Sequence, residues 1–199
     1  MNAHQKIFLT ALTSALLTTL SVSAADKYVG RCDVEFIGDS TLTAFTGHIT
    51  NVPLTVICRT NNAGEALLNT RIEIGPRQLT THNTKRDAHM YKMFLEDSFP
   101  KLIAAVTNAP LGAAKLSPSI PPADAGKLPV QLTFCGITKE VSAATTSPQH
   151  CTNGWEFDLE TNVSLKDFKL KPPGMLLGAI SVHDLVKVKA HVKVQQAPP

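Results

Sequence analysis

The sequence predicts an all-β domain that closes into an antiparallel barrel, with one short helix at its rim. Three observations predict it. Polar and apolar residues alternate with a period of two along several segments, only one segment of the mature chain has helical spacing, and strands do not alternate with helices as in a parallel sheet. Seven or eight such strands fit a sandwich or a barrel. We favour the barrel, because a single helix covers few of the edges that an open sheet exposes.

Residues 1–25 predict a secretory signal peptide that does not belong to the fold. Lys6 gives a weakly basic start, residues 7–22 form an uncharged apolar run, and small residues follow up to Ala25. An uncleaved membrane anchor is the alternative, but the run is shorter than the roughly 20 residues that span a bilayer. We therefore expect an exported protein, periplasmic or secreted, with a barrel domain at 26–195 and a flexible tail at 196–199.

Two segments in the first half of the chain predict a β-hairpin. Residues 54–60 and 66–74 are rich in Thr, Ile, Val and Leu, which strands prefer. Asn61, Asn62 and Gly64 between them are typical of a tight turn.

The segment 86–97 predicts the only helix of the mature chain, because its apolar residues Met90, Met93 and Phe94 recur at helical spacing. Asn83 or Thr84 can cap its start, and Pro100 ends it. The Pro-, Ala- and Gly-rich residues 108–126 predict a long loop at one rim.

The second half of the chain predicts the remaining strands. Alternation runs through 130–134, 155–163 and 182–194, and Gly136 indicates a bulge or bend before a further strand at 137–143. In the last segment the even-numbered residues are mostly Val, while Lys and His dominate the odd-numbered ones. Asp184 and Leu185 are the exceptions to this pattern.

Four cysteines, Cys32, Cys58, Cys135 and Cys151, lie in the mature chain, and an even number in an oxidising compartment predicts disulfides. Of the three pairings we prefer the local one, Cys32–Cys58 with Cys135–Cys151. Closing the loop between Cys135 and Cys151 is worth about 3 kcal/mol in the chain-entropy model. A zinc site is the alternative, but no two cysteines have the short spacing of such sites.

Charge and motifs argue against several classes of function. Removing residues 1–25 takes away Lys6 alone and leaves 18 basic against 16 acidic residues, a net charge of +2 that is too small and too evenly spread to indicate nucleic acid or an anionic membrane surface. Asp158 and Glu160 alternate with apolar residues and are expected to face solvent. The chain contains no HExxH or GxSxG motif, so we expect no enzyme, and His89 is the histidine to check for one.

Three stretches of the chain resemble the YceI family, in the family's order. TKRDAHMYKMFL at 84–95, running into SFPKL at 98–102, resembles its central signature, in which an Arg-Asp pair opens a short helix. LTFCGITKEV at 132–141 is similar to its strand-bend-strand motif. FIGDSTL at 36–42 with FTG at 45–47 resembles the opening of its periplasmic members, except that Thr43-Ala44 stand where that opening often has His-Asp, and the loop at 108–126 is longer than expected.

The resemblance implies an extended, lipocalin-like, eight-stranded antiparallel barrel whose relatives bind polyisoprenoid chains in an internal tunnel. Such a chain has mostly apolar surface to offer, so its affinity comes from area removed from water, at about 25 cal/mol per Å². We therefore expect the ligand-binding residues among the inward apolar side chains, the three motifs and the helix: Phe36, Leu42, Phe45, Arg86, Asp87, Met90, Met93, Phe94, Leu132, Phe134, Phe157, Leu159, Val186 and Val188.

Arg86 and Asp87 have two readings: they bind a polar head group, or they form an ion pair that orients the helix. For the whole protein the first hypothesis is a carrier or buffer that holds an isoprenoid, quinone or other lipid in the barrel, with no metal or other cofactor, no nucleic-acid partner and no integral membrane association. A barrel filled with side chains that serves a structural or interaction role is the second, and a hydrolase is the third. The sequence leaves a homodimer open.

Overall fold

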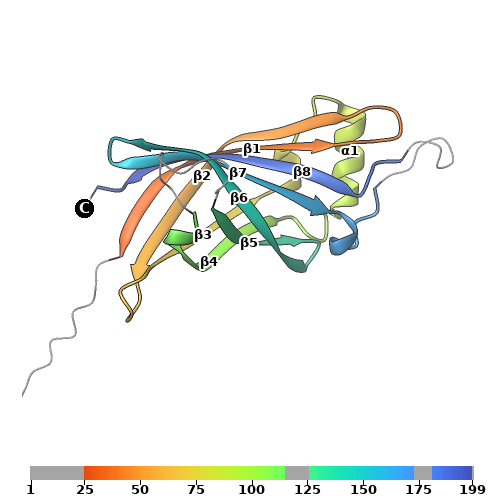
Figure 1. Ribbon diagram of the computed structural model, residues 1–199. Coiled ribbons are helices and arrows are strands. Elements are labelled where there is room, and N and C mark those ends of the chain that lie inside the picture. Colours follow the sequence, from red (N-terminus) through yellow and green to blue (C-terminus); the bar gives the residue numbers. More distant parts are fainter. Residues whose placement is uncertain (1–24, 115–125, 173–180, 199) are drawn as a thin grey trace, which may run out of the picture.

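The structure is an eight-stranded antiparallel barrel that is closed by pairing of the last strand with the first. The computed structural model describes residues 25–114, 126–172 and 181–198 (Figure 1). Each strand pairs with the next, and β8 pairs with both β7 and β1. The predicted barrel is therefore confirmed, and the sandwich is excluded.

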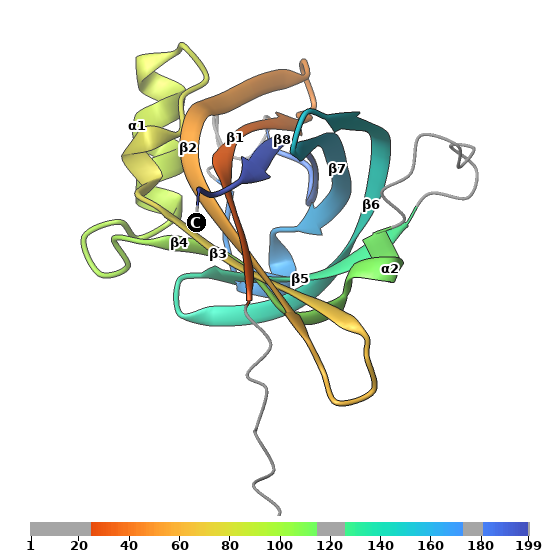
Figure 2. The ribbon, with the colours of Figure 1, turned by 90° about the vertical axis from the view of Figure 1, so that its left-hand side faces the viewer.

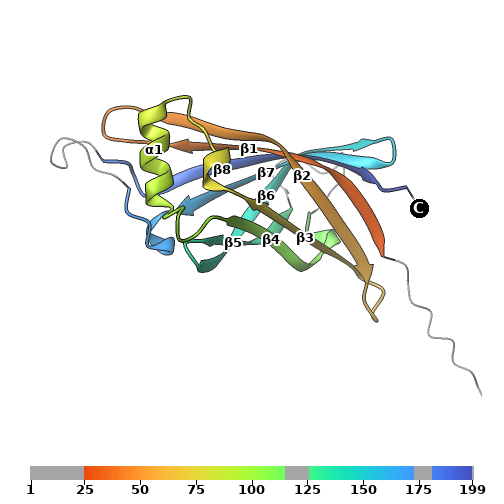
Figure 3. The ribbon, with the colours of Figure 1, turned by 180° about the vertical axis from the view of Figure 1, so that it is seen from behind.

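The strands are β1 (Asp26–Gly38), β2 (Phe45–Thr60), β3 (Ala66–Ile74), β4 (Leu102–Pro110), β5 (Lys127–Phe134), β6 (Ile137–Cys151), β7 (Gly154–Ser164) and β8 (Leu185–Gln196). Two α-helices, α1 (Thr84–Met93) and α2 (Leu111–Ala114), lie outside the ring of strands (Figure 2), and the described residues also form short 3-10 helices at Pro76–Gln78 and Lys166–Phe168. Figures 1 and 3 place α1 at one end of the barrel and the described C-terminus at the other. We call the end at α1 the mouth and the opposite end the far end.

The turns and the helix start follow from local side-chain chemistry. The Asn61 side chain accepts from the amides of Ala63 and Glu65, which forms the predicted turn between β2 and β3. Cys135 and Gly136 both have positive φ, which gives the bend predicted before β6. At the helix start, the Asn83 side chain accepts from the Arg86 amide.

Some predicted boundaries were wrong. β8 begins at Leu185, not at residue 182, because Asp184 turns to accept hydrogen bonds from the Ser164 hydroxyl (2.8 Å) and the Lys166 amide (2.9 Å). The helix ends at Met93, before residue 97. Residues 108–110 belong to β4, and the rest of the expected 108–126 loop begins as α2, with residues 115–125 outside the described part. The tail predicted at 196–199 begins later in the chain, since β8 reaches Gln196 and the amide of Ala197 donates to the carbonyl of Lys27.

Three β-bulges bend the sheet. They lie between β1 and β2, between β3 and β4, and between β6 and β7. At the first, Asn51 has a φ of 58° and its amide donates to Asp33 (2.6 Å). The extra residue changes which residues of β2 face inward, from Phe45 and Gly47 before it to Val52, Leu54 and Val56 after it.

The outer face of β7 and β8 carries a ladder of ion pairs. Glu156 contacts Lys193 (2.8 Å), and Glu160 contacts both Lys187 (2.9 Å) and Lys189 (3.0 Å). Asp158 lies 2.7 Å from the imidazole of His191. The alternation predicted for these two strands thus separates an apolar interior from a charged exterior.

At the far end the strands approach so closely that Gly30 in β1 has no room for a side chain. Gly30 lies opposite Val194, and an added Cβ would overlap the carbonyl oxygen of Lys193. We expect Gly30→Ala to lower the free energy of unfolding by about 1–3 kcal/mol, because the backbone of β8 must move. Urea unfolding followed by circular dichroism measures this. Gly112→Ala in α2, where a Cβ would meet no atom within 4 Å, is the control and should cost nothing; an equal loss in both variants would refute the steric explanation.

Candidate functional site

A cavity of about 680 Å³ runs inside the barrel. Its volume falls in the range of roughly 300–1,000 Å³ that holds small-molecule ligands. Along β2 its wall extends from Phe45 at the mouth to Val56, which at about 3.3 Å per residue is roughly 35 Å of strand. The space is therefore long, and it suits a chain-like molecule.

The wall of the cavity is apolar over most of its length. It is formed by inward Val, Leu, Ile, Phe and Ala side chains from all eight strands, together with Met side chains from α1. Every residue proposed from the sequence to bind a ligand lies in this wall except Asp87: Phe36, Leu42, Phe45, Arg86, Met90, Met93, Phe94, Leu132, Phe134, Phe157, Leu159, Val186 and Val188. The structure thus brings together residues from the three motifs and the alternating strands.

α1 lies beside the mouth, outside the ring of strands (Figure 2), and contributes its apolar face to the cavity. Met90 and Phe94 are buried, and Met93 packs against the same core. The Phe94 ring meets Phe134 edge-on at 5.8 Å between centroids, and Phe134 lies 4.6 Å from Phe168. These aromatic contacts join the helix to β5 and to the turn Lys166–Phe168, so the mouth has a defined shape.

Most polar side chains of the wall, including all the charged ones, gather at the mouth; Thr70 and Thr161 line it farther in. Ser40 and Thr43 come from the connection between β1 and β2, and Lys85, Arg86 and His89 come from α1. No Asp or Glu is among the described residues that line the cavity. One end of the long apolar space is therefore polar and basic.

Arg86 is held at this mouth by an aromatic ring. Its guanidinium carbon lies 4.8 Å from the centroid of Phe45, which is a cation–π distance. Phe45 also lies in the cavity wall, so the stacked guanidinium borders the cavity. Leu42, in the preceding connection, is 72% exposed and leaves an apolar edge beside the mouth.

Asp87 does not line the cavity and is a correction to the predicted site. It is buried (8% exposed), and its carboxylate accepts hydrogen bonds from the Thr81 amide (2.8 Å), the Thr81 hydroxyl (2.6 Å) and the Thr80 hydroxyl (2.8 Å). Burial on its own raises the pKa of Asp87, but these hydrogen bonds and the nearby Arg86 outweigh it and hold the pKa below its usual value. Asp87 ties the first turn of α1 to the segment that precedes it.

Sequence reasoning missed most of the far half of the cavity, where Phe157 is the one proposed residue, level with Cys32 through Val192. The residues that line it there include Cys32, Val52, Leu54, Val56, Leu68, Val106 and Leu128. Those of β1 could have been found from their own alternation, since Cys32, Val34 and Phe36 alternate with Arg31, Asp33 and Glu35. In β2 the bulge at Asn51 interrupts the period of two, so no single alternation covers the strand.

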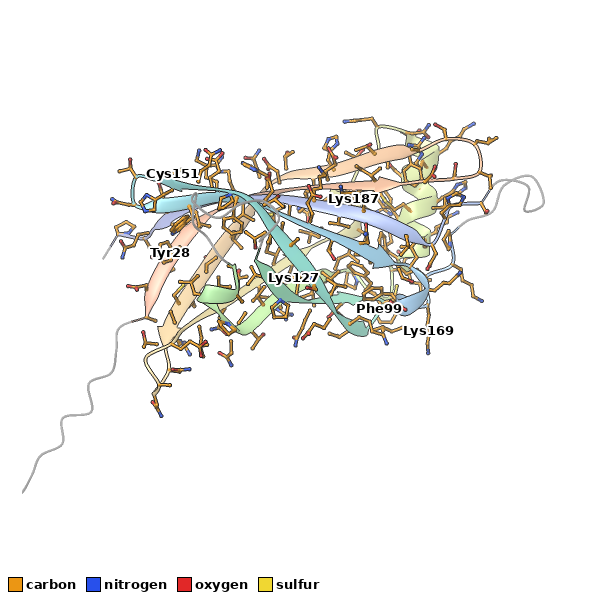
Figure 4. The ribbon with its side chains drawn as sticks, viewed as in Figure 1. Tyr28, Phe99, Lys127, Cys151, Lys169 and Lys187 are labelled. Atoms are coloured by element: carbon orange, nitrogen blue, oxygen red, sulfur yellow. The ribbon has the colours of Figure 1, made fainter. Side chains whose placement is uncertain are left out.

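The predicted disulfides are wrong, since all four cysteines are free thiols. Cys32 lies opposite Val52 and Cys58 lies opposite Asp26, so they are separated by roughly 20 Å along the strands. Cys135 precedes β6 and Cys151 ends it, and Figure 4 shows Cys151 near Tyr28, at the end of the barrel away from Phe99. A disulfide needs Cα atoms closer than about 7 Å.

Each thiol has its own environment instead. Cys58 is partly buried, and burial raises its pKa. Cys32 is buried in the cavity wall, and burial raises its pKa to about 12. The Cys135 thiol donates to the carbonyl of Phe94 (3.1 Å), close to the end of α1. Cys151 lies 3.8 Å from the carboxylate of Glu156. None of these settings brings two sulfurs together.

We therefore expect thiol titration of the denatured, non-reduced protein to find four reactive groups. Under native conditions Cys32 should react at least about tenfold more slowly than Cys151, because it is buried and its thiolate form is disfavoured. A Cys151→Ser variant identifies the fast group. Finding no thiol in the denatured protein would contradict the register of β1, β2 and β6.

The described residues contain no group of three or more His, Cys, Asp or Glu that could hold a metal ion. In the same ranges, no helix is long and apolar enough to cross a membrane.

Comparisons with known proteins agree with the barrel. The sequence profile of the YceI-like domain matches residues 30–194. Among solved structures, BcnA from Burkholderia cenocepacia superposes with a TM-score of 0.59 at 13% identity, covering 82% of this chain and 95% of that one. A polyisoprenoid binding domain from Saccharophagus degradans, described as implicated in plant cell wall breakdown, gives 0.56 at 12% identity, covering 87% and 100%. At these identities the two structures establish the fold. No curated protein sequence matches significantly.

Proposed function

Since this chain belongs to the YceI-like domain family, we propose that it is an exported, non-enzymatic protein that holds a long isoprenoid lipid in its barrel, as a carrier or buffer. The observation that carries the proposal is the cavity, which is long and apolar over most of its length, with its charged side chains at the mouth. The Saccharophagus degradans domain of the same fold is described as polyisoprenoid-binding, which supports this choice among apolar ligands.

The energetics suit a prenyl chain. A chain buried along the wall gains about 25 cal/mol for each Å² removed from water, and ordering the flexible chain costs part of that gain. Met90 and Met93 at the mouth adapt to ligands of different shape, because the Met side chain is unbranched and flexible. A barrel filled with side chains would lack this space, so the cavity argues against the structural role.

A hydrolase would require a nucleophile and a base close together in the cavity. The described wall has one cysteine, Cys32, deep in the apolar part with a raised pKa, and one histidine, His89, at the mouth. A deeply buried thiol of high pKa is a poor nucleophile, and Cys32 and His89 belong to different ends of the cavity. Ser40 also lies at the mouth, but its hydroxyl donates to the carbonyl of Thr43 (2.8 Å). Binding is the function that this arrangement favours.

The decisive experiment is mass spectrometry of the protein purified natively from the exporting cell. We expect an isoprenoid lipid to co-purify in near-stoichiometric amount, and the delipidated protein to take up geranylgeraniol with a Kd in the micromolar range or below. The isolated chain should begin after residue 25 and fractionate outside the cytoplasm. An empty protein that also takes up no prenyl compound would refute the proposal.

A further inference from the structure

Two histidines far apart in the sequence lie with their imidazoles in contact outside the cavity. His48 is on β2, and His82 lies two residues before α1. Their ring centroids are 4.6 Å apart, and the ring planes are inclined at 54°. Neither residue lines the cavity, and His82 is exposed while His48 is partly buried. Small ions in solution can therefore reach the pair.

The backbone that carries the two imidazoles is fixed. His48 and Thr80 exchange two backbone hydrogen bonds, of 2.8 and 3.0 Å, which join β2 to the segment before α1. The hydroxyls of Thr80 and Thr81 donate in turn to the buried Asp87. His82 has a φ of 56°, in the left-handed region, and its amide donates to the Thr80 hydroxyl (3.1 Å). The rings are therefore held side by side by contacts that leave their nitrogens unused.

The other described histidines have partners of a different kind: carboxylates at His183 and His191, an indole at His150 and the cavity wall at His89. In the described part of the chain, no hydrogen bond or ion pair engages the imidazole of His48 or His82. A neutral imidazole has one nitrogen with a free lone pair and is the commonest metal ligand in proteins. The pair therefore offers two such nitrogens at one place on the surface.

The separation of the rings suits two ligands of one ion. A nitrogen–metal bond of about 2.0–2.1 Å places each ring centroid about 3.2 Å from the ion, so two imidazoles bound at about 90–110° have centroids about 4.5–5.2 Å apart. The observed 4.6 Å lies near the lower end of this range, which corresponds to neighbouring ligands in the tetragonal sites of Cu²⁺ and Ni²⁺. The last torsion of a histidine side chain is broad and roughly two-fold, so either ring can turn until a nitrogen faces the ion.

We propose that His48 and His82 form a site for a divalent transition-metal ion, with Cu²⁺ bound most tightly and water completing the coordination. The ion joins β2 to the segment that leads into α1. Because neither histidine lines the cavity, the site is separate from the one proposed for the lipid.

Calorimetry of the metal-free full chain, without a histidine tag, tests the site with Ni²⁺, which does not oxidise the thiols. We expect one Ni²⁺ to bind at the pair and no binding of Mg²⁺, which prefers oxygen ligands. His48→Gln and His82→Gln should each weaken Ni²⁺ binding at least about tenfold, since losing even a residue that only supports a metal ligand costs that much. His150→Gln, which removes a histidine stacked on Trp155, is the control and should leave Ni²⁺ binding unchanged.

Two further measurements distinguish a shared site from a single ligand. The electron paramagnetic resonance spectrum of one equivalent of Cu²⁺ should show coupling to two imidazole nitrogens in the unaltered chain and to fewer in either variant. Saturating Ni²⁺ should raise the urea midpoint of unfolding of the unaltered chain and leave that of His82→Gln unchanged, because a ligand that binds only the folded state stabilises it.

Absence of Ni²⁺ binding by the unaltered chain would overturn the inference, and so would binding that both variants retain. Loss in only one of the two variants would mean a single histidine with other ligands and would overturn it as well. Geranylgeraniol binding should stay within about twofold in all of these variants, since neither ring borders the cavity. The metal site and the lipid function can therefore fail independently.

Discussion

Replacing Ala190 with Trp is expected to weaken the binding of a long prenyl chain at least about a hundredfold while sparing a short one. Ala190 lies in the cavity wall on β8, between Val34 of β1 and Leu159 of β7 in the register. It is farther from the mouth than Val188, which lies opposite Phe36. An indole at this position projects into the middle of the cavity and divides it.

The size of the effect follows from the buried hydrocarbon. Each buried CH₂-sized group is worth about 0.8 kcal/mol, so one five-carbon unit contributes about 4 kcal/mol before ordering costs. If the indole excludes even one unit, the affinity for the C20 alcohol should fall at least about a hundredfold, at 1.4 kcal/mol for each factor of ten. The C10 alcohol, which fits above the obstruction, should change less than about threefold.

The measurement is a series of Kd values for C10, C15 and C20 prenyl alcohols with both proteins. Affinity should rise with each unit in the unaltered protein and stop rising at a shorter length in Ala190→Trp. Leu185→Trp is the matched control, because Leu185 is on the same strand, 61% exposed, and outside the cavity wall. A uniform loss at every length, or an unchanged series, would contradict a continuous tunnel past Ala190.

The sequence alone predicts the barrel, the mouth half of the cavity and Phe157 in its far half, because all of these depend on local patterns. Period-two alternation in β7 and β8 identifies the inward residues directly, and Phe157, Leu159, Val186 and Val188 all line the cavity. The helical spacing of Met90, Met93 and Phe94 does the same for α1. In these elements the backbone is regular, so the spacing of two residues in the sequence shows whether their side chains point to the same face.

Where the backbone is irregular, the spacing in the sequence no longer shows which face a side chain is on. The bulge at Asn51 reverses the inward face of β2, and nothing in the composition of 45–60 states where it lies. The disulfide prediction failed for a related reason. Cys135 and Cys151 are near in sequence, but the strand between them is extended, so a short loop in the chain becomes one barrel length in space.

Asp87 was misassigned because a residue type does not show which of its roles the fold uses. In a first helical turn a carboxylate can face a ligand, pair with the adjacent arginine or cap local donors. The structure uses the third role, through Thr80 and Thr81. Those two residues precede the helix and carry no motif, so the partner could not be recognised in advance.

Asp87→Ala is expected to destabilise the protein by about 3–5 kcal/mol. The substitution leaves the Thr81 amide and hydroxyl and the Thr80 hydroxyl without their acceptor, and hydrogen bonds to a charged group are worth about 1.5–3 kcal/mol each without being additive. Because the first turn of α1 then loses its anchor, prenyl-alcohol binding should weaken as well. Denaturant unfolding measures the first effect. Asp97→Ala, an exposed acid just beyond α1, should cost less than about 0.5 kcal/mol.

The pH dependence of the loss distinguishes the charge of Asp87 from its shape. Burial raises the pKa of Asp87, but the hydrogen bonds lower it by more. The pKa in the folded protein therefore lies below the value of about 3.9 in the unfolded chain. The contribution of Asp87 is therefore complete above about pH 4 and is lost as the pH falls through the folded-state pKa. The difference in unfolding free energy between the unaltered protein and the isosteric Asp87→Asn variant should be constant at neutral pH and should narrow only below pH 4. A gap that persists unchanged in acid would mean that Thr80 and Thr81 are satisfied by the shape of the side chain alone, and that its charge does not hold α1 beside the mouth.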